Sequence, residues 1–277
     1  MTFELGDRFE THGEAKAKLF DYLEVFYNQE RRHSTLGYLS PGDYERAARM
    51  RQVAYDPQVF IGHFAVAFAS KAAAPRVSLA PLLVAPLALD MLWPIFLVLG
   101  IETVRIVPGD TAVTPLDLHD YPWSHSLVMS LVWAALAALL GWMALRQILA
   151  ALVLGAGVFS HFILDFISHR PDLPLWPGSA TYLGLGLWNS KLATALVEVP
   201  LFAIGVWLYC RSTRPTSKAG TINLVAMVAL LGLLYVGNLT GPPPPSVKAL
   251  IIAAFASWIF IPWAWFIDRR RGPPIRA

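Results

Sequence analysis

Three residues that can bind a metal ion share one stripe of a predicted helix. His161, Asp165 and His169 follow one another at intervals of four residues. In a helix, this spacing places an imidazole, a carboxylate and a second imidazole on the same face. Neutral imidazole and carboxylate together are typical ligands of divalent cations. The spacing therefore predicts a ligand stripe, and the alternative is a pair of interfacial histidines beside a solvated aspartate.

The helix that carries this stripe is predicted to cross a membrane. An uncharged apolar run, 148–157, precedes the stripe and places it at one end of the candidate span. Asp90 stands near the middle of another apolar run, with no Lys or Arg beside it. An unpaired carboxylate there costs roughly 2.5–3.5 kcal/mol on insertion scales. We therefore expect a bound cation near Asp90, and a protonated, hydrogen-bonded side chain is the alternative.

Further polar residues recur in apolar surroundings. His63 follows Gly62 at the start of a short apolar run, and His125 and Ser126 open a longer one. Each of these alone is typical of an interfacial position or, for Ser126, of a helix start. Together with Asp90 and the ligand stripe, they indicate one polar site at the end of several helices. His119, by contrast, falls in a polar connection and is expected to be solvated.

The composition fits the membrane assignment. The 277 residues are 56% hydrophobic and 15% charged, and the mean hydropathy is +0.50. These values exclude an ordinary soluble protein and predict a polytopic membrane protein. The single cysteine, Cys210, excludes an internal disulfide framework and a thiolate metal cluster, so a metal would need His and carboxylate ligands.

The predicted fold is all-α, with six to seven transmembrane helices preceded by a short soluble helical fragment. Six apolar runs are long enough to span, and the first of the seven is marginal. The runs are 60–73, 79–101, 125–145, 148–167, 192–210, 222–239 and 249–267.

Basic residues lie in alternate connections, and the positive-inside rule makes these connections and the C-terminus cytoplasmic. The connection 102–124 is then extracytoplasmic, and His125 and His169 lie at that face. If 60–73 also crosses, His63 joins them there. If it is a half-length interfacial helix, His63 is harder to place.

Residues 1–56 have a different character from the rest, 57–277. They carry many charges, slightly more acidic than basic, and no long apolar run. Thr11 and Glu14 fit a capping box, and apolar residues at helical spacing predict an amphipathic helix from about Gly13 to Asn28.

This N-terminal segment resembles the C-terminal end of the integrase-like core of DDE insertion-sequence transposases, over roughly residues 3–47. The resemblance rests on LFDYLEVFYN at 19–28, RRHS at 31–34, LGY at 36–38 and SP at 40–41. It implies that Glu4 stands where the third catalytic carboxylate would be, while the first two would lie on strands that this chain lacks. Two-metal chemistry needs the whole set. We therefore expect an inactive remnant joined in frame to a membrane protein, with no functional nucleic-acid binding; a residual DNA-binding or integration-related role is the alternative.

The membrane region resembles the bacterial inner-membrane metal-dependent hydrolases, described in one branch as LexA-binding, over about 60–210. Gly62-His63, Asp90 with a proline nearby, His125-Ser126 and His161-x3-Asp165 carry the resemblance. The family typically shows Asp-x-Asp, and His-Arg-Gly before Thr-His-Ser. This chain has a single Asp90, and Tyr-Pro-Trp-Ser precedes His125, so it resembles a divergent branch.

The resemblance implies a metal-dependent hydrolase that uses a divalent cation, zinc above all, to activate water against an ester or phosphoester. It implies Asp165 and His169 as catalytic residues, with a free carboxylate or His169 as general base. The implied metal ligands are His63, Asp90, His125, His161 and Asp165. Location alone suggests a membrane lipid or lipid-linked substrate. An ion or proton transporter and a non-enzymatic membrane protein remain alternatives.

Overall fold

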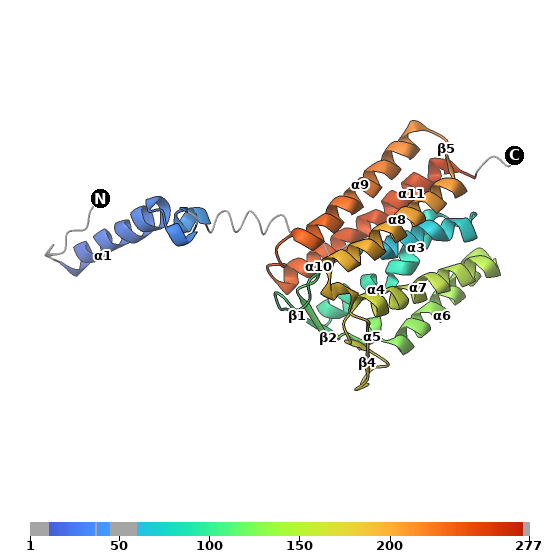
Figure 1. Ribbon diagram of the computed structural model, residues 1–277, viewed down its shortest axis with the longest axis horizontal. Helices are drawn as coiled ribbons and strands as arrows, with labels where there is room; N and C mark the ends of the chain where they lie inside the picture. Colours follow the sequence, from blue (N-terminus) through green and yellow to red (C-terminus); the bar gives the residue numbers. More distant parts are fainter. Residues whose placement is uncertain (1–10, 37, 45–59, 274–277) are drawn as a thin grey trace. The chain divides into compact units, whose positions relative to one another are not determined.

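The computed structural model describes residues 11–36, 38–44 and 60–273, and the chain divides into two units, Met1–Tyr55 and Asp56–Ala277 (Figure 1). In the first unit, helix α1 (His12–Phe20) continues into π-helix η1 (Asp21–Glu30), followed by the 3-10 turn η2 (Ser34–Leu36). The Thr11 side chain accepts a hydrogen bond from the Glu14 backbone, as the capping motif predicts. The predicted N-terminal helix is therefore confirmed. Glu4 lies outside the described residues.

The apolar side chains of α1 and η1 have little to pack on. Neither helix has a buried residue, and Leu19, Phe20 and Leu23 are exposed. An amphipathic helix gains most of its stability by burying its apolar face. The described part of the first unit provides no surface that does so.

The second unit is mostly helical, with six helices that are long and apolar enough to cross a membrane. The predicted set of six long apolar helices is therefore confirmed. They are α4 (Leu79–Val98), α6 (Leu127–Leu145), α7 (Ile148–Ser168), α8 (Lys191–Ser212), α9 (Lys218–Thr240) and a continuous helix made of α10 (Val247–Ala256), the 3-10 turn η4 (Ser257–Ile259) and α11 (Phe260–Arg269).

The marginal run forms a short, buried helix, α3 (Ile61–Ala73). Thirteen residues extend about 20 Å, too short for a hydrocarbon layer of about 30 Å. Helix α3 packs instead among α4, α7 and α8. A Cβ at Gly205 of α8 would overlap the backbone of Ala65, so this glycine permits the close approach of the two helices.

Short strands in the connections modify the predicted all-α class. Strands β1 (Thr103–Ile106) and β2 (Leu116–Asp120) pair antiparallel, as do β3 (Leu173–Pro174) and β4 (Tyr182–Leu183), and β5 (Arg214–Pro215) with β6 (Arg271–Gly272). The connections between the helices also hold the short helices α5 (Pro122–His125) and η3 (Leu187–Asn189). Strand pairing provides hydrogen-bond partners for backbone N–H and C=O groups in the connections between helices. Side-chain periodicity does not reveal this requirement.

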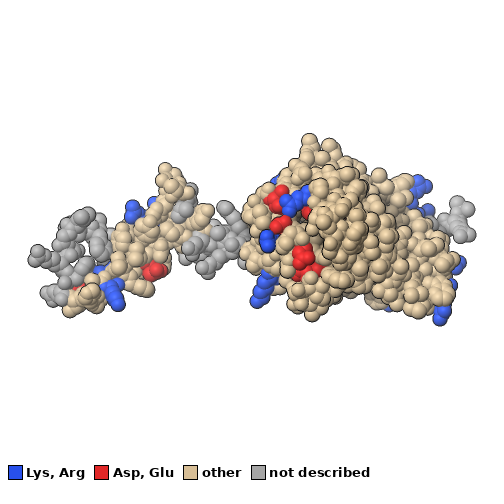
Figure 2. Space-filling model, turned by 90° about the horizontal axis from the view of Figure 1, so that it is seen from below, with Lys and Arg blue, Asp and Glu red and all other residues tan. Residues whose placement is uncertain are grey.

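Charge is distributed unevenly along the second unit. On the face shown in Figure 2, Lys and Arg appear with Asp and Glu at one end, Lys and Arg alone at the other, and an uncharged band lies between. The end with Lys and Arg alone is the one that carries β5 in Figure 1. This distribution is the one that the sequence predicts from its alternating basic connections.

Candidate metal centre

Four elements bring the five predicted metal ligands into one site. Helix α3 carries His63, α4 carries Asp90, α5 ends on His125, and α7 carries His161 and Asp165. Two groups, His63–His161–Asp165 and Asp90–His125–His161, each offer ligand atoms within 4.8 Å of one another. His161 belongs to both groups. Because α3 is buried against α7, His63 joins the site although α3 is too short to span.

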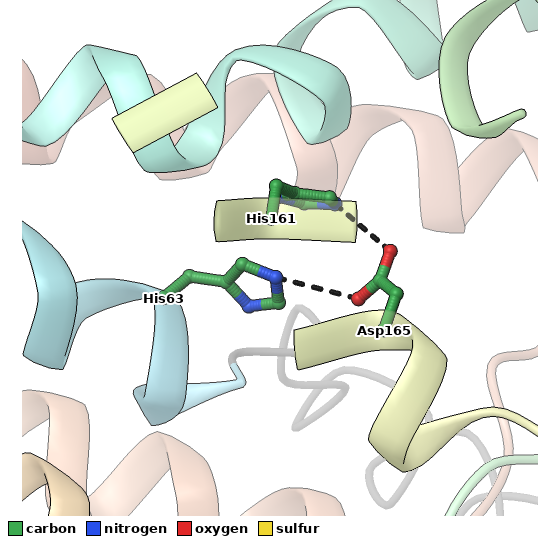
Figure 3. Close-up of side chains that lie close together, drawn as sticks. All are labelled: His63, His161 and Asp165. Atoms are coloured by element: carbon green, nitrogen blue, oxygen red, sulfur yellow. Dashed lines mark ion pairs between the residues drawn. The ribbon is translucent and has the colours of Figure 1, made fainter. Parts of the chain in front are cut away.

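Asp165 lies at the centre of this site. Its Oδ2 is 3.1 Å from Nε2 of His161 and 3.8 Å from Nε2 of His125. Its Oδ1 is 3.3 Å from Nε2 of His63 and 3.9 Å from Nε2 of His169. Figure 3 shows His63 and His161 both directed toward the carboxylate. Four imidazoles from different parts of the chain thus converge on one buried anion.

Asp90, on α4, lies near two of these imidazoles, those of His125 and His161. Its Oδ1 lies 3.6 Å from Nε2 of His125 and 3.7 Å from Nε2 of His161. The side chain of Asp90 is 42% exposed, whereas that of Asp165 is 4% exposed. Asp90 lines a cavity beside the site together with His125, Asp165 and His169. It is therefore the carboxylate that a ligand in this cavity meets first.

The hydrogen bond at Nδ1 of His161 determines where its lone pair points. Nδ1 lies 2.8 Å from the backbone oxygen of Pro86. A carbonyl oxygen only accepts, so Nδ1 must carry the hydrogen. In the neutral ring, Nε2 then presents a lone pair to the two carboxylates and to His125.

A longer hydrogen-bond chain fixes His125 in the same way. The Ser124 hydroxyl donates to Oε2 of Glu102 over 2.7 Å, and Nδ1 of His125 lies 2.6 Å from Ser124 Oγ. Burial raises the pKa of Glu102 above its ordinary value, although His125 and hydrogen bonds from Ser124 and Trp123 oppose that shift. With the carboxylate ionised, the Ser124 hydrogen points to Glu102, so Nδ1 of His125 donates to Ser124. The lone pair of His125 again lies on Nε2.

His169 lies just outside the helix that the spacing predicts for it. Helix α7 ends at Ser168, and His169 has extended backbone angles of φ −69° and ψ 149°. Its Nδ1 is 3.0 Å from Oδ1 of Asp172, which also accepts from the Tyr121 hydroxyl. Burial first, and then the charge of Asp172, raise the pKa of Tyr121 well above its usual range, so the phenol keeps its proton. This pair holds His169 with Nε2 facing Asp165.

Arg170, the residue after His169, connects the end of α7 to the β1–β2 hairpin. It donates to Asp110 over 2.6 Å, to Asp117 over 2.9 Å and to Asp172 over 3.4 Å. Burial opposes its charge, but the three carboxylates outweigh burial and raise the pKa of Arg170 further. The two polar connections are thereby joined beside the site.

Sequence reasoning missed the outer partners of these histidines. Glu102 and Asp172 are acidic residues near predicted ligands, which is a weak signal, and the Pro86 carbonyl leaves no signal because every residue has one. Ser126 serves as N-cap of α6, accepting from the backbone of Met129. His119 lies on β2, exposed, away from the cluster and 3.2 Å from the Thr103 hydroxyl, as its predicted solvated position requires.

Comparison with known proteins concerns the first unit. Residues 2–48 match the integrase core domain family. Over 38 residues, the chain is 50% identical to the transposase for insertion sequence element IS904 of Lactococcus lactis subsp. lactis (strain IL1403), covering 14% of this chain and 15% of that protein. The transposase resemblance predicted for the N-terminal segment is thus confirmed. No solved structure matches the chain.

Proposed function

We propose that the second unit is a membrane-embedded, metal-dependent hydrolase with one divalent cation, zinc by preference, held by the five clustered residues. The observation that carries this proposal is the distance of 3.2 Å between Nε2 of His125 and Nε2 of His161. Both rings direct their hydrogen outward through Nδ1, so their lone pairs face each other and two carboxylates. A cation between them removes this repulsion.

The donor set fits such an ion. Imidazole nitrogens with carboxylate oxygens suit zinc, and the charges of Asp90 and Asp165 balance a divalent cation. Two of the histidine ligands also have the outer partners that metal ligands usually have: the Pro86 carbonyl for His161, and Ser124 with Glu102 for His125.

One ion accounts for both candidate groups. Both use Nε2 of His161, whose other nitrogen is committed to Pro86. A single lone pair serves a single cation. The absence of a second Asp beside Asp90 agrees with this count.

A divalent cation held by these residues would supply Lewis acidity, which would lower the pKa of a water so that it could attack an ester or phosphoester near neutral pH. His169 is placed to accept the proton, because Asp172 holds its Nδ1 and leaves Nε2 facing the cavity. Asp90, on the cavity wall, orients the incoming group. Asp165 holds the imidazoles together.

We further propose a bacterial inner-membrane location with the arginine-rich C-terminal end in the cytoplasm and the metal centre near the opposite face. The six long apolar helices, and the end that shows Lys and Arg without Asp or Glu in Figure 2, support this orientation. For the N-terminal unit we propose an origin in a transposase, supported by the integrase core match over residues 2–48 and by the identity to a transposase over 38 residues.

Metal analysis of the full chain, purified in mild detergent, tests the proposal. We expect one zinc per chain, together with hydrolysis of a soluble chromogenic ester or phosphodiester that a chelator abolishes and zinc restores. If the purified chain holds no metal and does not bind added zinc, the short contact between His125 and His161 is instead a hydrogen bond from a protonated imidazole. That result would overturn the metal centre. A zinc-loaded chain inactive on both substrate classes would overturn the hydrolase.

A further inference from the structure

A cavity lined mostly by apolar residues, with Asp90 and Ser257 among them, adjoins the metal centre on the side of α10 and α11. We call it the chain pocket. It has a volume of about 70 Å³. Its apolar walls come from Phe64, Met91, Leu250, Ala254, Trp258 and Ile261.

The chain pocket and the metal-centre cavity share a wall. The metal-centre cavity, of about 50 Å³, is lined by His125, Asp165 and His169 among others. Phe60, Asp90 and Trp93 line both cavities. Asp90 thus stands at the boundary between the cavity that reaches the predicted metal ligands and the chain pocket.

The chain pocket borders an apolar trough along α4. Two further cavities, of about 510 and 280 Å³, lie between α4, α6 and α7 and share Val84 and Ala88 of α4. They meet the chain pocket at Met91, Trp258 and Ile261, which line it as well. The trough extends to Ala80, ten residues before Asp90, or about 15 Å along the helix. A series of neighbouring cavities, which we call the track, thus runs from the metal centre along helices long enough to cross a membrane.

We propose that this track binds the hydrocarbon chain of a lipid whose scissile ester lies at the metal centre. The inference rests on the proposed hydrolase and names its substrate class. The occupant follows from the walls: the trough is lined by apolar side chains and offers water few polar partners, whereas a chain fits both its chemistry and its elongated form. The boundary at Asp90 places the polar end of such a molecule beside the metal ligands.

Photolabelling tests the site without turnover. The full chain in detergent is incubated with a palmitoyl lysophospholipid that carries a diazirine on its chain, then irradiated, digested and mapped by mass spectrometry. We expect labels within 250–261 of α10–α11 and 84–91 of α4. Ala254→Phe, which fills the chain pocket, should lower labelling there at least fivefold. Ala256→Phe, at an exposed position of the same helix, should leave it unchanged.

Ala88→Phe provides a second, independent obstruction in the trough, so one misfolded variant does not decide the result. Equal labelling of the parent, Ala254→Phe and Ala88→Phe, or labels spread evenly over exposed apolar faces such as that of α6, would overturn the chain site.

Chain-length selectivity separates this inference from the hydrolase itself. Ala254→Phe should raise the KM for p-nitrophenyl palmitate several-fold and leave that for p-nitrophenyl butyrate unchanged. Equal effects on both esters would contradict binding of a hydrocarbon chain in the track, but they would not contradict the proposed hydrolase. Specific photolabelling of a chain that hydrolyses neither ester would overturn the hydrolase and leave the lipid site standing.

Discussion

Nε2 of His125 and Nε2 of His161 lie 3.2 Å apart, while Nδ1 of His125 is engaged by Ser124 and Nδ1 of His161 by the Pro86 carbonyl. The two rings come from different helices, 36 residues apart in sequence. Folding therefore brings two ring nitrogens together beside two carboxylates. A bound cation would suit this cluster, and the following predictions depend on that proposal.

Replacing Asp165 by Asn should remove most of the bound metal. The substitution keeps the size of the side chain but removes the charge on which four imidazoles converge. Metal per chain, measured by mass spectrometry on protein that still inserts, should fall at least tenfold. His119→Ala, outside the cluster, serves as control and should match the parent. Equal metal in all three proteins would contradict the assignment.

Ser124→Ala should weaken metal binding while leaving every ligand in place. It breaks the connection between His125 and Glu102, and loss of such an outer partner typically costs 10–100-fold in affinity. Competition with a zinc chelator of known affinity measures the change. Ser126→Ala is the matched control: it removes the N-cap of α6, at about 1 kcal/mol of stability, and should not change the affinity. Similar affinities for the two variants would argue against the outer-partner role.

Removing the metal should lower the thermal stability of the second unit. A ligand that binds only the folded state stabilises it by about 2.7 kcal/mol at a concentration one hundred times its Kd. We expect the melting temperature to fall when a chelator is added and to recover with excess zinc. For Asp165→Asn, the chelator should have little effect, since little metal is left to lose. A parent chain that melts at the same temperature in both conditions would count against a structural contribution of the ion.

Deleting residues 1–56 and restoring a start codon should leave membrane insertion and metal content unchanged. The helices of the first unit expose their apolar residues, and all clustered ligands lie in the second unit. Membrane fractionation and metal analysis measure the outcome. In a separate assay, strand transfer by the full chain on DNA bearing insertion-sequence ends would show that the N-terminal unit is active after all.

A reporter fused after Ala277 and active only in an oxidising compartment should be silent. Arg269 ends the last long helix and Arg270 and Arg271 follow it, and basic residues of this kind are retained in the cytoplasm. A second reporter in the β1–β2 connection should be active, which controls for expression. The reverse pattern would invert the orientation and place the metal centre near the cytoplasmic face.

Local sequence patterns were sufficient for the long helices and for part of the site. Hydrophobicity over some twenty residues determines whether a helix can span, and a four-residue interval alone places His161 and Asp165 on one face. The N-terminal helix and its cap were predictable for the same reason. Each of these features depends on residues that are close together in the sequence.

Only the tertiary structure decided how the site is completed. His63 and His125 reach Asp165, and Asp90 reaches His161, because of the rotation and depth at which α3 and α4 pack on α7 and α5 packs on α4. No local period records those values. Helix α3 contributes a ligand although it is too short to span, since it is buried by its neighbours. The Pro86 carbonyl and the track also arise from packing, because every residue has a carbonyl and a cavity belongs to no single segment.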